Sequence, residues 1–555
     1  MSDRDPVTVL ATHEVTNQPP DLEGYNLYDT DRALKEALHR EGAGWAEDKV
    51  RSMGAAAGSE RVIRLAFEAN DNPPRLRAFD RFGRRVDEVE FHPAYHQLMK
   101  LAIGFGVHSI AWTAPRPGGY VAHTALEYLL TQAEAGVCCP LTMTHAVVPT
   151  IRRQPEIAAE WEPRILSNEY DPRAIPAGEK AGATFGMALT EKQGGSDLRA
   201  NTTRAIPIGP GGPGAEYELK GHKWFCSAPM SDAFMTLAST EKGLSCFIVP
   251  RWRPDGSRNP FLIQRLKDKL GNRSNASCEV EYDGTWGRMI GDEGGGVPII
   301  MDMVQNTRLD TSLAAAGLMR QATVQAAHHA SHRTAFQKRL CQQPLMANVL
   351  ADLALESEAA TLTVMRVARG FDESAADEQA RAFARIAVSL AKYWINKRLP
   401  NHVYEALECH GGGGYVEESI MARLYREAPL NSIWEGSGNV ICLDVLRAMG
   451  RQPAALEAFI AEVENGRGGD HRLDAAIDRL KDMLNDKSEL ETRARLITER
   501  MALVLQGALM VRHAPAALAD AFCASRLGGD WGRAYGTLPS AVDCDQIIER
   551  ITLSS

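Results

Sequence analysis

Apolar residues recur at three- and four-residue spacing over most of the chain, which is the pattern of amphipathic helices. The spacing holds from about Asp31 to Leu166, for example in His123–Gln132, and it resumes at Ile299. One predicted helix carries apolar side chains on a single face: Phe383, Ile386, Leu390 and Trp394. We expect the glycine block Gly411–Gly414 to end the helical run that contains them, because glycine is unfavourable inside a helix.

A different pattern separates the two helical regions. After Gly186 the chain has a cluster of turn-forming residues, Ile206–Gly214, which we interpret as a loop. Short alternating or apolar runs lie on its C-terminal side: Glu216–Lys220, Ala233–Ser239, Leu244–Pro250 and Ala276–Asp283. Such runs are typical of strands with a buried face, so they predict a compact β domain.

Helical periodicity also continues through Arg451–Ser555, which is long enough for a separate helical module. Its clearest apolar series is Leu496, Ile497, Met501, Val504 and Ala508. We therefore predict a mainly α-helical protein with a central β domain. The expected domains are an N-terminal helical domain over 1–185, a middle β domain over 186–295, a helical domain over 296–446 and an extra C-terminal helical domain over 447–555.

Length and composition fit this multidomain plan. The chain has 555 residues, of which 44% are hydrophobic and 24% charged, as in ordinary globular proteins. The formal net charge of −9 argues mildly against nucleic acid and anionic membranes as partners. The ten cysteines show no paired spacing and indicate thiols in a reducing compartment. Because the N-terminus is mostly polar, we expect no signal peptide, and the apolar stretch Met501–Val511 is only about half a membrane span. We expect a cytoplasmic protein without a transmembrane helix.

Several common functional motifs are missing. No Walker P-loop occurs, and Gly209–Gly214 matches the letters of a dinucleotide-binding turn without the strand and helix that the turn requires. No Gly-x-Ser-x-Gly nucleophile turn is present either. His328 and His332 have the i, i+4 spacing of metal ligands, but no further ligand pattern surrounds them. We therefore expect neither covalent hydrolysis nor a bound metal.

Most of the candidate functional residues lie in three stretches: Leu189–Asp197 (LTEKQGGSD), His222–Ser227 (HKWFCS) and Asn431–Asn439 (NSIWEGSGN). The first offers hydroxyls and accessible backbone N–H groups, which suit a flavin edge and its pyrophosphate. Together, the three stretches resemble the signature motifs of the acyl-CoA dehydrogenase family. The resemblance implies the fold of that family, FAD as the cofactor, and an acyl-CoA or related alkyl compound as the substrate.

The resemblance also implies which residues bind FAD. Phe225 and Ser227 stand where the family usually has Trp and Thr, and the substitution of Phe for Trp keeps an aromatic ring while it removes the indole donor. Leu266–Asn275 is similar to a strand of the family that contains Lys-Leu-Gly-x-Arg. The full implied set is Met187, Leu189, Thr190, Gly195, Ser196, Phe225, Cys226, Ser227, Arg333, Trp434, Ser437 and Asn439.

Some residues of this set imply contacts with the far side of FAD or across a subunit interface. Ser437 and Asn439 stand where family members contact the adenosine side of FAD. Arg333, with Phe336, resembles an Arg-x-x-Phe-Gly motif whose Arg reaches FAD across a subunit interface, although Gln337 replaces the Gly. If the resemblance holds at Arg333, FAD binding requires at least a dimer.

Glu435 is the catalytic residue that the resemblance implies. In the family, the corresponding Glu removes the α-proton of the substrate while a hydride leaves the β-carbon for the flavin. A carboxylate suits this task when a closed apolar pocket raises its pKa, and Trp434 and Tyr415 could supply such surroundings. The alternative for an isolated Glu before a glycine is a solvated turn residue.

Further stretches place the resemblance in one branch of the family. Arg40–Trp45 (REGAGW), the C-terminal segment and long runs around the three motifs are similar to flavoproteins of the bacterial response to DNA alkylation. This similarity implies a homotetramer with weak acyl-CoA dehydrogenase activity. It also implies non-specific binding of double-stranded DNA, with Arg447 at a contact position.

Charge gives the DNA hypothesis little support. Arg451–Ser555 has 13 Lys and Arg against 16 Asp and Glu, which is not the composition of a DNA-binding surface. Further arginines could gather near Arg447 on a helix face: Arg493, Arg495 and Arg500. The most basic stretch is Arg251–Arg273, with seven Lys and Arg against two Asp.

Three functional hypotheses remain open from the sequence. The first is an FAD enzyme that oxidises an acyl thioester or a related alkyl compound. The second is a DNA-binding flavoprotein that protects DNA or helps to repair it. The third is a relic of an acyl-CoA dehydrogenase whose C-terminal module serves only assembly.

Overall fold

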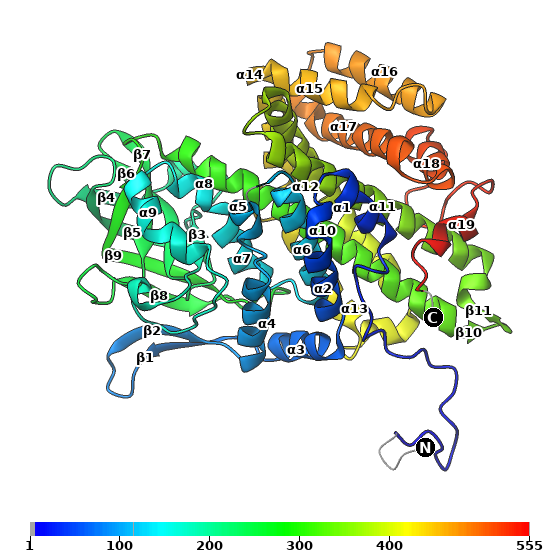
Figure 1. The fold of residues 1–555 in the computed structure, drawn as a ribbon, viewed down its shortest axis with the longest axis horizontal. Helices are drawn as coiled ribbons and strands as arrows, with labels where there is room; N and C mark the ends of the chain where they lie inside the picture. The colour runs from blue at the N-terminus through cyan, green and yellow to red at the C-terminus, as the bar shows by residue number, and fades with distance from the viewer. Residues whose placement is uncertain (1–5, 115, 554–555) are drawn as a thin grey trace.

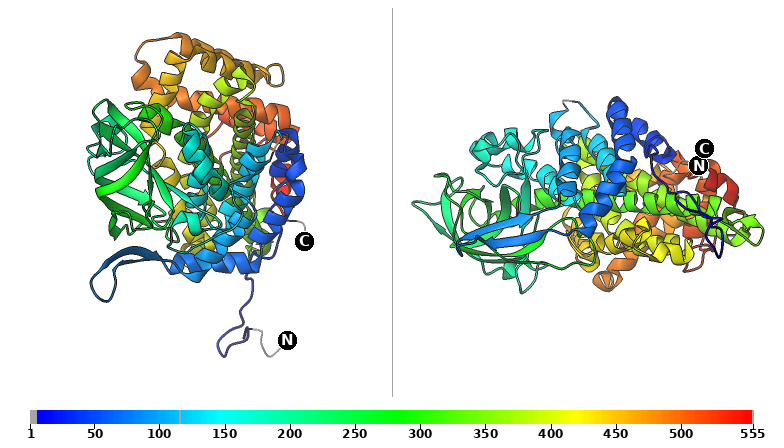
Figure 2. Two further views of the ribbon diagram at one scale, coloured as in Figure 1. Left: turned by 60° about the vertical axis from the view of Figure 1, so that its left-hand side comes forward. Right: turned by 90° about the horizontal axis from the view of Figure 1, so that it is seen from below.

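Most of the β strands lie at one end of the molecule, and long helices form most of the rest (Figure 1). This arrangement is seen in a computed structural model that describes residues 6–114 and 116–553. Figure 2 shows the same two parts from two further sides. The predicted fold, mainly α-helical with a central β domain, is confirmed.

The N-terminal region is helical, as its apolar spacing predicts. Its helices are α1 (Arg32–Arg40), α2 (Glu47–Ala57), α3 (Glu60–Asp71), α4 (Pro93–Gly104), α5 (Ile110–Thr113), α6 (Gly119–Ala133), α7 (Cys138–Ala146), α8 (Val148–Ile151) and α9 (Pro155–Ile165). The predicted stretch His123–Gln132 lies inside α6. This helix is buried on nearly every side because it packs against other helices all round.

The β domain contains the four strands that the alternation predicts, and shorter ones that it does not. The strands are β3 (Phe185–Ala188), β4 (Arg204–Pro207), β5 (Glu216–Ser227), β6 (Ala233–Thr240), β7 (Gly243–Pro250), β8 (Phe261–Leu266) and β9 (Ser277–Ile290). The order in the sheet is β3, β6, β4, β5, β9, β7, with β8 beside β9. A further pairing of β6 with β7 closes the sheet on itself, and aromatic side chains fill its interior: Tyr217, Phe234, Phe247 and Phe261.

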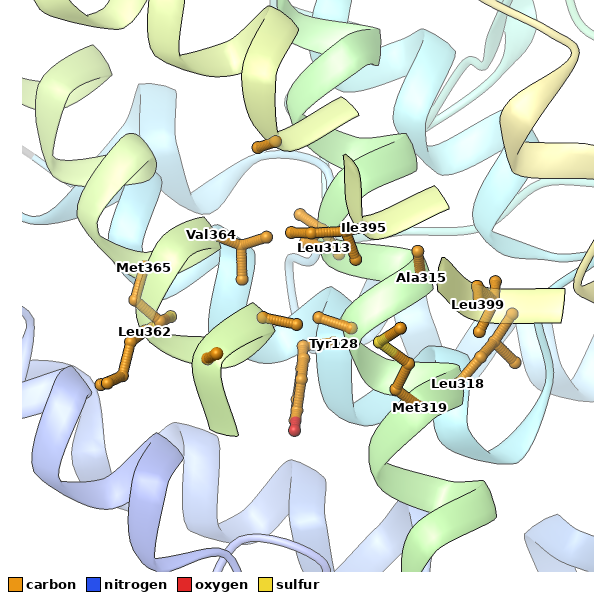
Figure 3. Close-up of a cluster of buried hydrophobic side chains, with 14 of the residues drawn as sticks. Tyr128, Leu313, Ala315, Leu318, Met319, Leu362, Val364, Met365, Ile395 and Leu399 are labelled. Carbon is orange, nitrogen blue, oxygen red and sulfur yellow. The ribbon is translucent and has the colours of Figure 1, made fainter. Parts of the chain in front are cut away.

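Long helices form the centre of the molecule: α10 (Gly296–His332), α11 (Pro344–Glu373), α12 (Glu378–Glu408), α13 (Ile420–Glu427) and α14 (Gly438–Arg451). The predicted apolar face of Phe383, Ile386, Leu390 and Trp394 is buried on α12. That helix ends just before the glycine block, as expected. Figure 3 shows apolar side chains where α6, α10, α11 and α12 meet, among them Tyr128, Leu313, Leu362 and Ile395. Burial of each such side chain contributes about 1.5–3 kcal/mol.

Leu266–Asn275 is not a strand, so that expectation is wrong. β8 ends at Leu266, and the residues that follow form bends and a loop. The reason is close packing against α13. A Cβ atom at Gly271 would lie 2.3 Å from the carbonyl oxygen of Arg426, and Asn272 has a left-handed φ of 54°. The chain therefore turns here instead of extending alongside β9.

A hairpin that the helical spacing does not predict links the N-terminal helices to the β domain. It consists of β1 (Arg75–Phe79) and β2 (Arg85–Glu90), which pair antiparallel. Arg85 donates a hydrogen bond to the carbonyl oxygen of Ile263 on β8 at 2.6 Å, and Asp87 accepts one from the Ile263 N–H at 3.0 Å. The hairpin therefore packs against the outer strand of the sheet.

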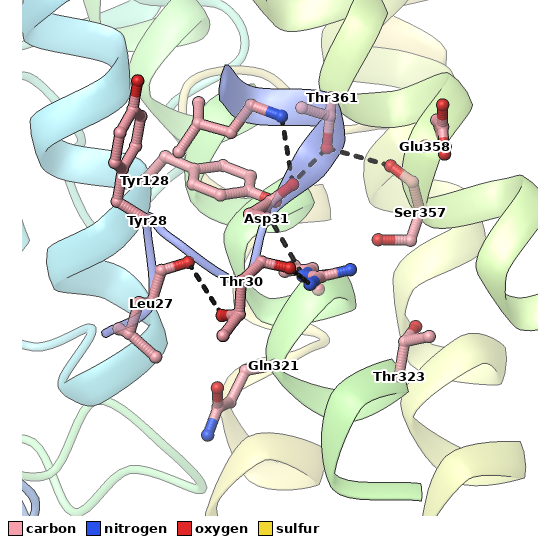
Figure 4. A network of polar contacts seen from close by, with 12 residues as sticks. Leu27, Tyr28, Thr30, Asp31, Tyr128, Gln321, Thr323, Ser357, Glu358 and Thr361 are labelled. Atoms are coloured by element: carbon pink, nitrogen blue, oxygen red, sulfur yellow. Dashed lines mark hydrogen bonds and ion pairs between the residues drawn. The ribbon is translucent and has the colours of Figure 1, made fainter. Parts of the chain in front are cut away.

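A polar network ties the segment before α1 to the central helices (Figure 4). The buried carboxylate of Asp31 accepts a hydrogen bond from the Tyr128 hydroxyl at 2.9 Å and lies 3.3 Å from Arg320 Nε. The Tyr128 hydroxyl also lies 3.3 Å from Thr361 Oγ1. Because a buried carboxylate without partners is costly, these contacts fix the segment against α6, α10 and α11.

The C-terminal segment is helical, as predicted: α15 (Pro453–Glu464), α16 (His471–Asn485), α17 (Leu490–His513), α18 (Ala516–Phe522) and α19 (Cys544–Glu549). In its apolar series the buried side chains are Ile497, Met501, Val504 and Ala508 on α17. Leu496 is exposed. These helices pack against α11, α12 and α14, so that one apolar core runs from α1 to α19.

Buried ion pairs reinforce this packing on α11. Arg526, directly after α18, contacts the carboxylate of Asp352 and lies 3.1 Å from Glu356 Oε2. Arg550, directly after α19, lies 2.7 Å from Glu358 Oε1 and 2.9 Å from Glu36 Oε2 on α1. The last helices are therefore joined both to the centre of the molecule and to its first helix.

The predicted domain boundaries stay predictions. The one between 446 and 447 falls inside α14, the one between 185 and 186 falls inside β3, and the one between 295 and 296 lies directly before α10. Among the helices of residues 6–114 and 116–553, none is long and apolar enough to cross a membrane.

Candidate active site

A cavity of about 1170 Å³ lies between the β domain and the central helices. The three motif stretches and the end of β3 meet there, and they contribute Met187, Leu189, Thr190, Gly195, Ser196, Phe225, Ser227, Trp434, Glu435 and Ser437. Pockets for drug-sized ligands measure about 300–1,000 Å³, so this cavity has room for a larger molecule.

The side chains of this cavity fit the ring and polar edges of a flavin, as the resemblance implies. Thr190, Ser196 and Ser227 bring hydroxyls to an otherwise largely apolar lining. A Cβ atom at Gly195 would lie 2.3 Å from Thr190 Oγ1, so glycine is needed for the backbone to pass this close. In the described chain the buried Oδ1 of Asn272, which also lines the cavity, has no hydrogen-bond partner and is free to accept one from a ligand.

Three expected FAD contacts lie outside this cavity: Cys226, Asn439 and Arg333. Cys226 is fully buried inside the sheet, because successive side chains of a strand point to opposite faces and its neighbours Phe225 and Ser227 face the cavity. Asn439 is at the start of α14, where its Oδ1 accepts a hydrogen bond from Arg495 Nε at 2.7 Å. The side chain of Asn439 thus links α14 to α17 instead of lining the cavity.

Arg333 lies beyond the opposite end of α10. The part of this helix that lines the cavity ends at Leu318, and Arg333 follows about 20 Å farther along the helix axis. Its Nη1 donates a hydrogen bond to the carbonyl oxygen of Asn17 at 2.6 Å, and the side chain of Phe336 nearby is 92% exposed. In a single chain Arg333 is too far from the cavity to contact a ligand there, so such a contact requires a second copy.

Glu435 combines an unusual backbone conformation with a fixed carboxylate. Its φ of 57° is left-handed, a conformation that costs a residue other than glycine about 1–2 kcal/mol. Thr307 on α10 donates a hydrogen bond to Glu435 Oε2 at 2.7 Å. Burial raises the pKa of the carboxyl, which suits a group that must accept a proton. Trp434 lines the same cavity, whereas Tyr415 is 81% exposed in the turn after α12, so the expectation for Tyr415 is wrong.

Two buried cations hold the loop that presents Glu435. Arg308 Nε lies 3.3 Å from the carbonyl oxygen of Glu435, and the Lys392 ammonium donates to the carbonyl oxygen of Gly436. Arg308 is itself fixed by Asp444 on α14 at 2.8 Å. Burial lowers the pKa of Lys392 to about 7. Sequence reasoning missed Lys392, although it is the single charged residue in the run AVSLAKYWI.

Arg447 lies at the cavity on α14, with 54% of its side chain exposed and its Nη1 3.3 Å from Asp444 Oδ1. The expected grouping of arginines around it is wrong for Arg493, which pairs with Asp486 at 2.7 Å near the start of α17. Arg493 and Arg495 are two positions apart on that helix and therefore point to different sides. Arg495 approaches α14 through its hydrogen bond to Asn439.

The basic stretch Arg251–Arg273 is largely occupied by contacts within the chain. Arg258 lies 2.7 Å from Glu88 Oε1. Arg265 and Lys267 both contact the carboxylate of Glu279, at 2.6 and 2.7 Å. These pairs reduce the positive charge that the stretch offers to phosphate groups.

Three family profiles match the chain. They describe the N-terminal domain of the adaptive response protein AidB over residues 17–172, the middle domain of acyl-CoA dehydrogenases over 186–285 and their C-terminal domain over 294–450. AidB of Escherichia coli (strain K12) is 45% identical over 514 residues, which cover 92% of this chain and 94% of that protein. Acyl-CoA dehydrogenase family member 11 of Caenorhabditis elegans is 31% identical over 82% of this chain and 78% of that protein.

Two solved structures share this fold over at least 90% of the chain. The apo form of Bd2924 has a TM-score of 0.82 and 28% sequence identity, and covers 90% of this chain and 99% of its own. ACDH-11 of Caenorhabditis elegans, in complex with C11-CoA, has a TM-score of 0.85 and 26% identity, and covers 99% of this chain and 100% of its own.

Proposed function

This chain belongs to the acyl-CoA dehydrogenase family, in its AidB branch, and from that premise we propose that it oxidises an acyl-CoA or a related small substrate with FAD. The observation that carries the proposal is the position of Glu435. Its carboxylate lies at a cavity large enough for a flavin and a substrate, on a loop that Arg308 and Lys392 hold in place.

The residues of the cavity have distinct parts in this reaction. Thr190, Ser196, Phe225 and Ser227 would hold the flavin. When bound, FAD supplies the acceptor for the hydride. Thr307 occupies Oε2 of Glu435, which leaves Oε1 to accept the proton from the substrate carbon.

The related ACDH-11 structure contains C11-CoA, which favours an acyl thioester as the substrate class. We therefore expect saturated acyl-CoA thioesters to reduce the flavin of the FAD-loaded protein in the absence of oxygen. The measurement is bleaching of the flavin absorbance during titration with acyl-CoAs of increasing chain length. A flavin that dithionite reduces but that no acyl-CoA in the series bleaches would reject the acyl-CoA part of the proposal.

The contact between Lys392 and the loop predicts a positioning role. Lys392→Met keeps most of the buried volume but removes the donor to Gly436, so we expect flavin reduction to slow about 10- to 100-fold because small displacements of a catalytic group have effects of this size. Stopped-flow reduction of the FAD-loaded variant measures the rate, and its flavin content shows whether the cavity is intact. Lys220→Met, at an exposed position of β5, is the control. Equal rates of flavin reduction for both variants would show that Lys392 does not position the loop of Glu435.

A second candidate function, non-specific binding of double-stranded DNA, is favoured by the exposed guanidinium of Arg447. We expect affinity to fall with salt, by about 0.9 in log K per tenfold increase in salt for each neutralised phosphate. Arg447→Glu should weaken binding to all duplex sequences equally, and Arg533→Glu, an exposed arginine on the C-terminal segment, should do so less. Fluorescence anisotropy of a labelled duplex tests both. An affinity that does not change with salt concentration, or equal losses of affinity in the two variants, would contradict a role for Arg447.

We also propose a homotetramer in a reducing cytoplasm. The distance of Arg333 from the cavity and the exposure of Phe336 support contacts between copies, and the cysteines of the described chain are free thiols. The mass of the FAD-loaded protein in sedimentation experiments tests the assembly.

A further inference from the structure

A set of buried charged side chains lies at the cavity, in addition to the residues described above. Glu127 on α6 and Asp310 on α10 both line the cavity. His123 lies between them, with its Nε2 3.1 Å from Asp310 Oδ1 and 3.4 Å from Glu127 Oε2. The three side chains are at most 1% exposed.

The charges of this set do not balance. His123 Nδ1 lies 2.6 Å from the carbonyl oxygen of Val107 and must donate to it, while Nε2 faces two carboxylates, so the ring is protonated. Burial lowers the pKa of His123, but Asp310 and Glu127 more than offset this and raise it to about 9. One cation therefore faces two acidic groups, and one of them lacks a counter-charge whenever both are ionised. Burial and the neighbouring Asp310 accordingly raise the pKa of Glu127 to about 8, so a further cation beside it would favour its ionised form.

The same carboxylates have unused hydrogen-bonding capacity. Thr142 donates to Glu127 Oε1 at 2.7 Å. Within the described residues Asp310 Oδ2 has no hydrogen-bond partner, and Glu127 Oε2 has only the ion pair with His123 Nε2, which already donates to Asp310. Buried acceptors are nearly always satisfied, because their loss of hydration is otherwise uncompensated. Two such acceptors beside an open cavity indicate that a bound ligand supplies the donors.

The position of these carboxylates relates them to the catalytic residue. Thr307, which donates to Glu435, and Asp310 are three residues apart on α10 and therefore lie on the same side of the helix, about 5 Å apart. A substrate that reacts at Glu435 can thus extend to Asp310. An all-alkyl chain would place methylene groups against the unpaired oxygens, whereas a group with N–H donors would satisfy them.

The geometry disfavours a metal ion in the same place. His123, His145 and Asp310 bring potential ligand atoms within 4.8 Å of one another. However, the two imidazole rings stack at 3.8 Å with 12° between their planes, so the ring nitrogens point in parallel directions instead of converging on one ion. His123 also uses both nitrogens as donors, and a metal ligand must be deprotonated.

We propose that Glu127 and Asp310 form a binding subsite for a protonated amine at the inner end of the substrate, so that the preferred substrates carry an ammonium group instead of a purely alkyl tail. The location of this subsite relative to Glu435 rests on the proposed oxidoreductase function. Binding of an amine at the subsite is independent of turnover. Charge-assisted hydrogen bonds from an ammonium group are shorter and stronger than those from a neutral hydroxyl.

Calorimetric titration of the FAD-loaded protein tests this with two probes of equal length, hexylammonium and 1-hexanol, at pH 7. We expect hexylammonium to bind at least about tenfold more tightly than 1-hexanol. Glu127→Gln and Asp310→Asn should each weaken hexylammonium binding about 10- to 100-fold and change 1-hexanol binding much less, because the amides keep the shape and lose the charge. Glu281→Gln, an exposed position on β9, is the matched control and should leave both affinities unchanged.

Equal binding of the two probes to the unaltered protein would overturn the subsite without any variant having to fold. Unchanged hexylammonium affinity in a folded, FAD-loaded Glu127→Gln protein would do the same. Reduction of the flavin by acyl-CoA together with indifference to amines rejects the subsite alone. Selective binding of hexylammonium together with a flavin that no acyl-CoA reduces supports the subsite and rejects the acyl-CoA substrate.

Discussion

Glu435→Gln slows reduction of the flavin by an acyl-CoA about 100- to 10,000-fold and leaves FAD bound, the range expected for loss of a general base. The amide has the size and shape of the carboxylate and still accepts the hydrogen bond from Thr307, but it cannot take up the substrate proton. The measurement is anaerobic stopped-flow reduction of the FAD-loaded variant, with the bound flavin determined from its absorbance. The control is Glu418→Gln, an exposed carboxylate in the turn after α12.

The pH dependence of the rate of flavin reduction gives a second test of Glu435 as the base. A base acts only when it is ionised, so the rate increases as pH rises through the pKa of Glu435. Burial raises this pKa, which places the increase above the ordinary value of about 4.3 for Glu. The increase disappears in the Gln variant. If the Glu435→Gln protein kept the rate and the pH profile of the unaltered enzyme, another group would be the base that accepts the substrate proton.

We expect Arg526→Leu to lower the free energy of unfolding by about 3–5 kcal/mol, because it leaves the carboxylate of Asp352 buried without this cation. Glu356 loses the same cation but keeps its ion pair with Arg398. Leu restores some apolar packing but provides no donor. Urea denaturation of the FAD-free protein, followed by circular dichroism, measures the effect through the midpoint.

Arg533→Leu is the matched control for this variant. Arg533 is exposed and lies seven residues farther along the same segment, so its replacement should change the stability by less than about 0.5 kcal/mol. If both variants unfold at the same urea concentration, the ion pairs on α11 do not hold the C-terminal helices.

The sequence predicts the larger elements of the fold because each has a sustained periodicity. The run Glu216–Lys220 alternates clearly and became part of β5, and the apolar face of α12 was visible from Phe383 to Trp394. β3 and β4 are only four residues long, too short to establish a period. The β1 and β2 hairpin lies within a region whose flanks are helical, and its side chains are mostly exposed or half-buried, so it lacks a strong apolar signal.

The candidate site was predictable where its residues follow one another along the chain. The motif around Glu435 names the base and Trp434 together, and alternation along β5 explains why Phe225 and Ser227 reach the cavity while Cys226 does not. Residues that contact the site from distant parts of the chain have no local sequence motif that would predict their role. Lys392 reaches the loop of Glu435 only because α12 packs beside α14, a contact that the sequence does not encode locally.

The pair of Arg550 with Glu36 and Glu358 has a consequence for the order in which the molecule is made. Glu36 and Arg550 are 514 positions apart in the chain, so α1 is synthesised long before this partner. Until Arg550 has left the ribosome, the carboxylate of Glu358 on α11 has no counter-ion for its buried position. The earlier helices can collapse on the growing chain, but the surface that α1 and α11 present to α19 stays open and polar until α19 has been synthesised. Docking of α19 therefore follows the collapse of these helices, and until then that surface is accessible to chaperones.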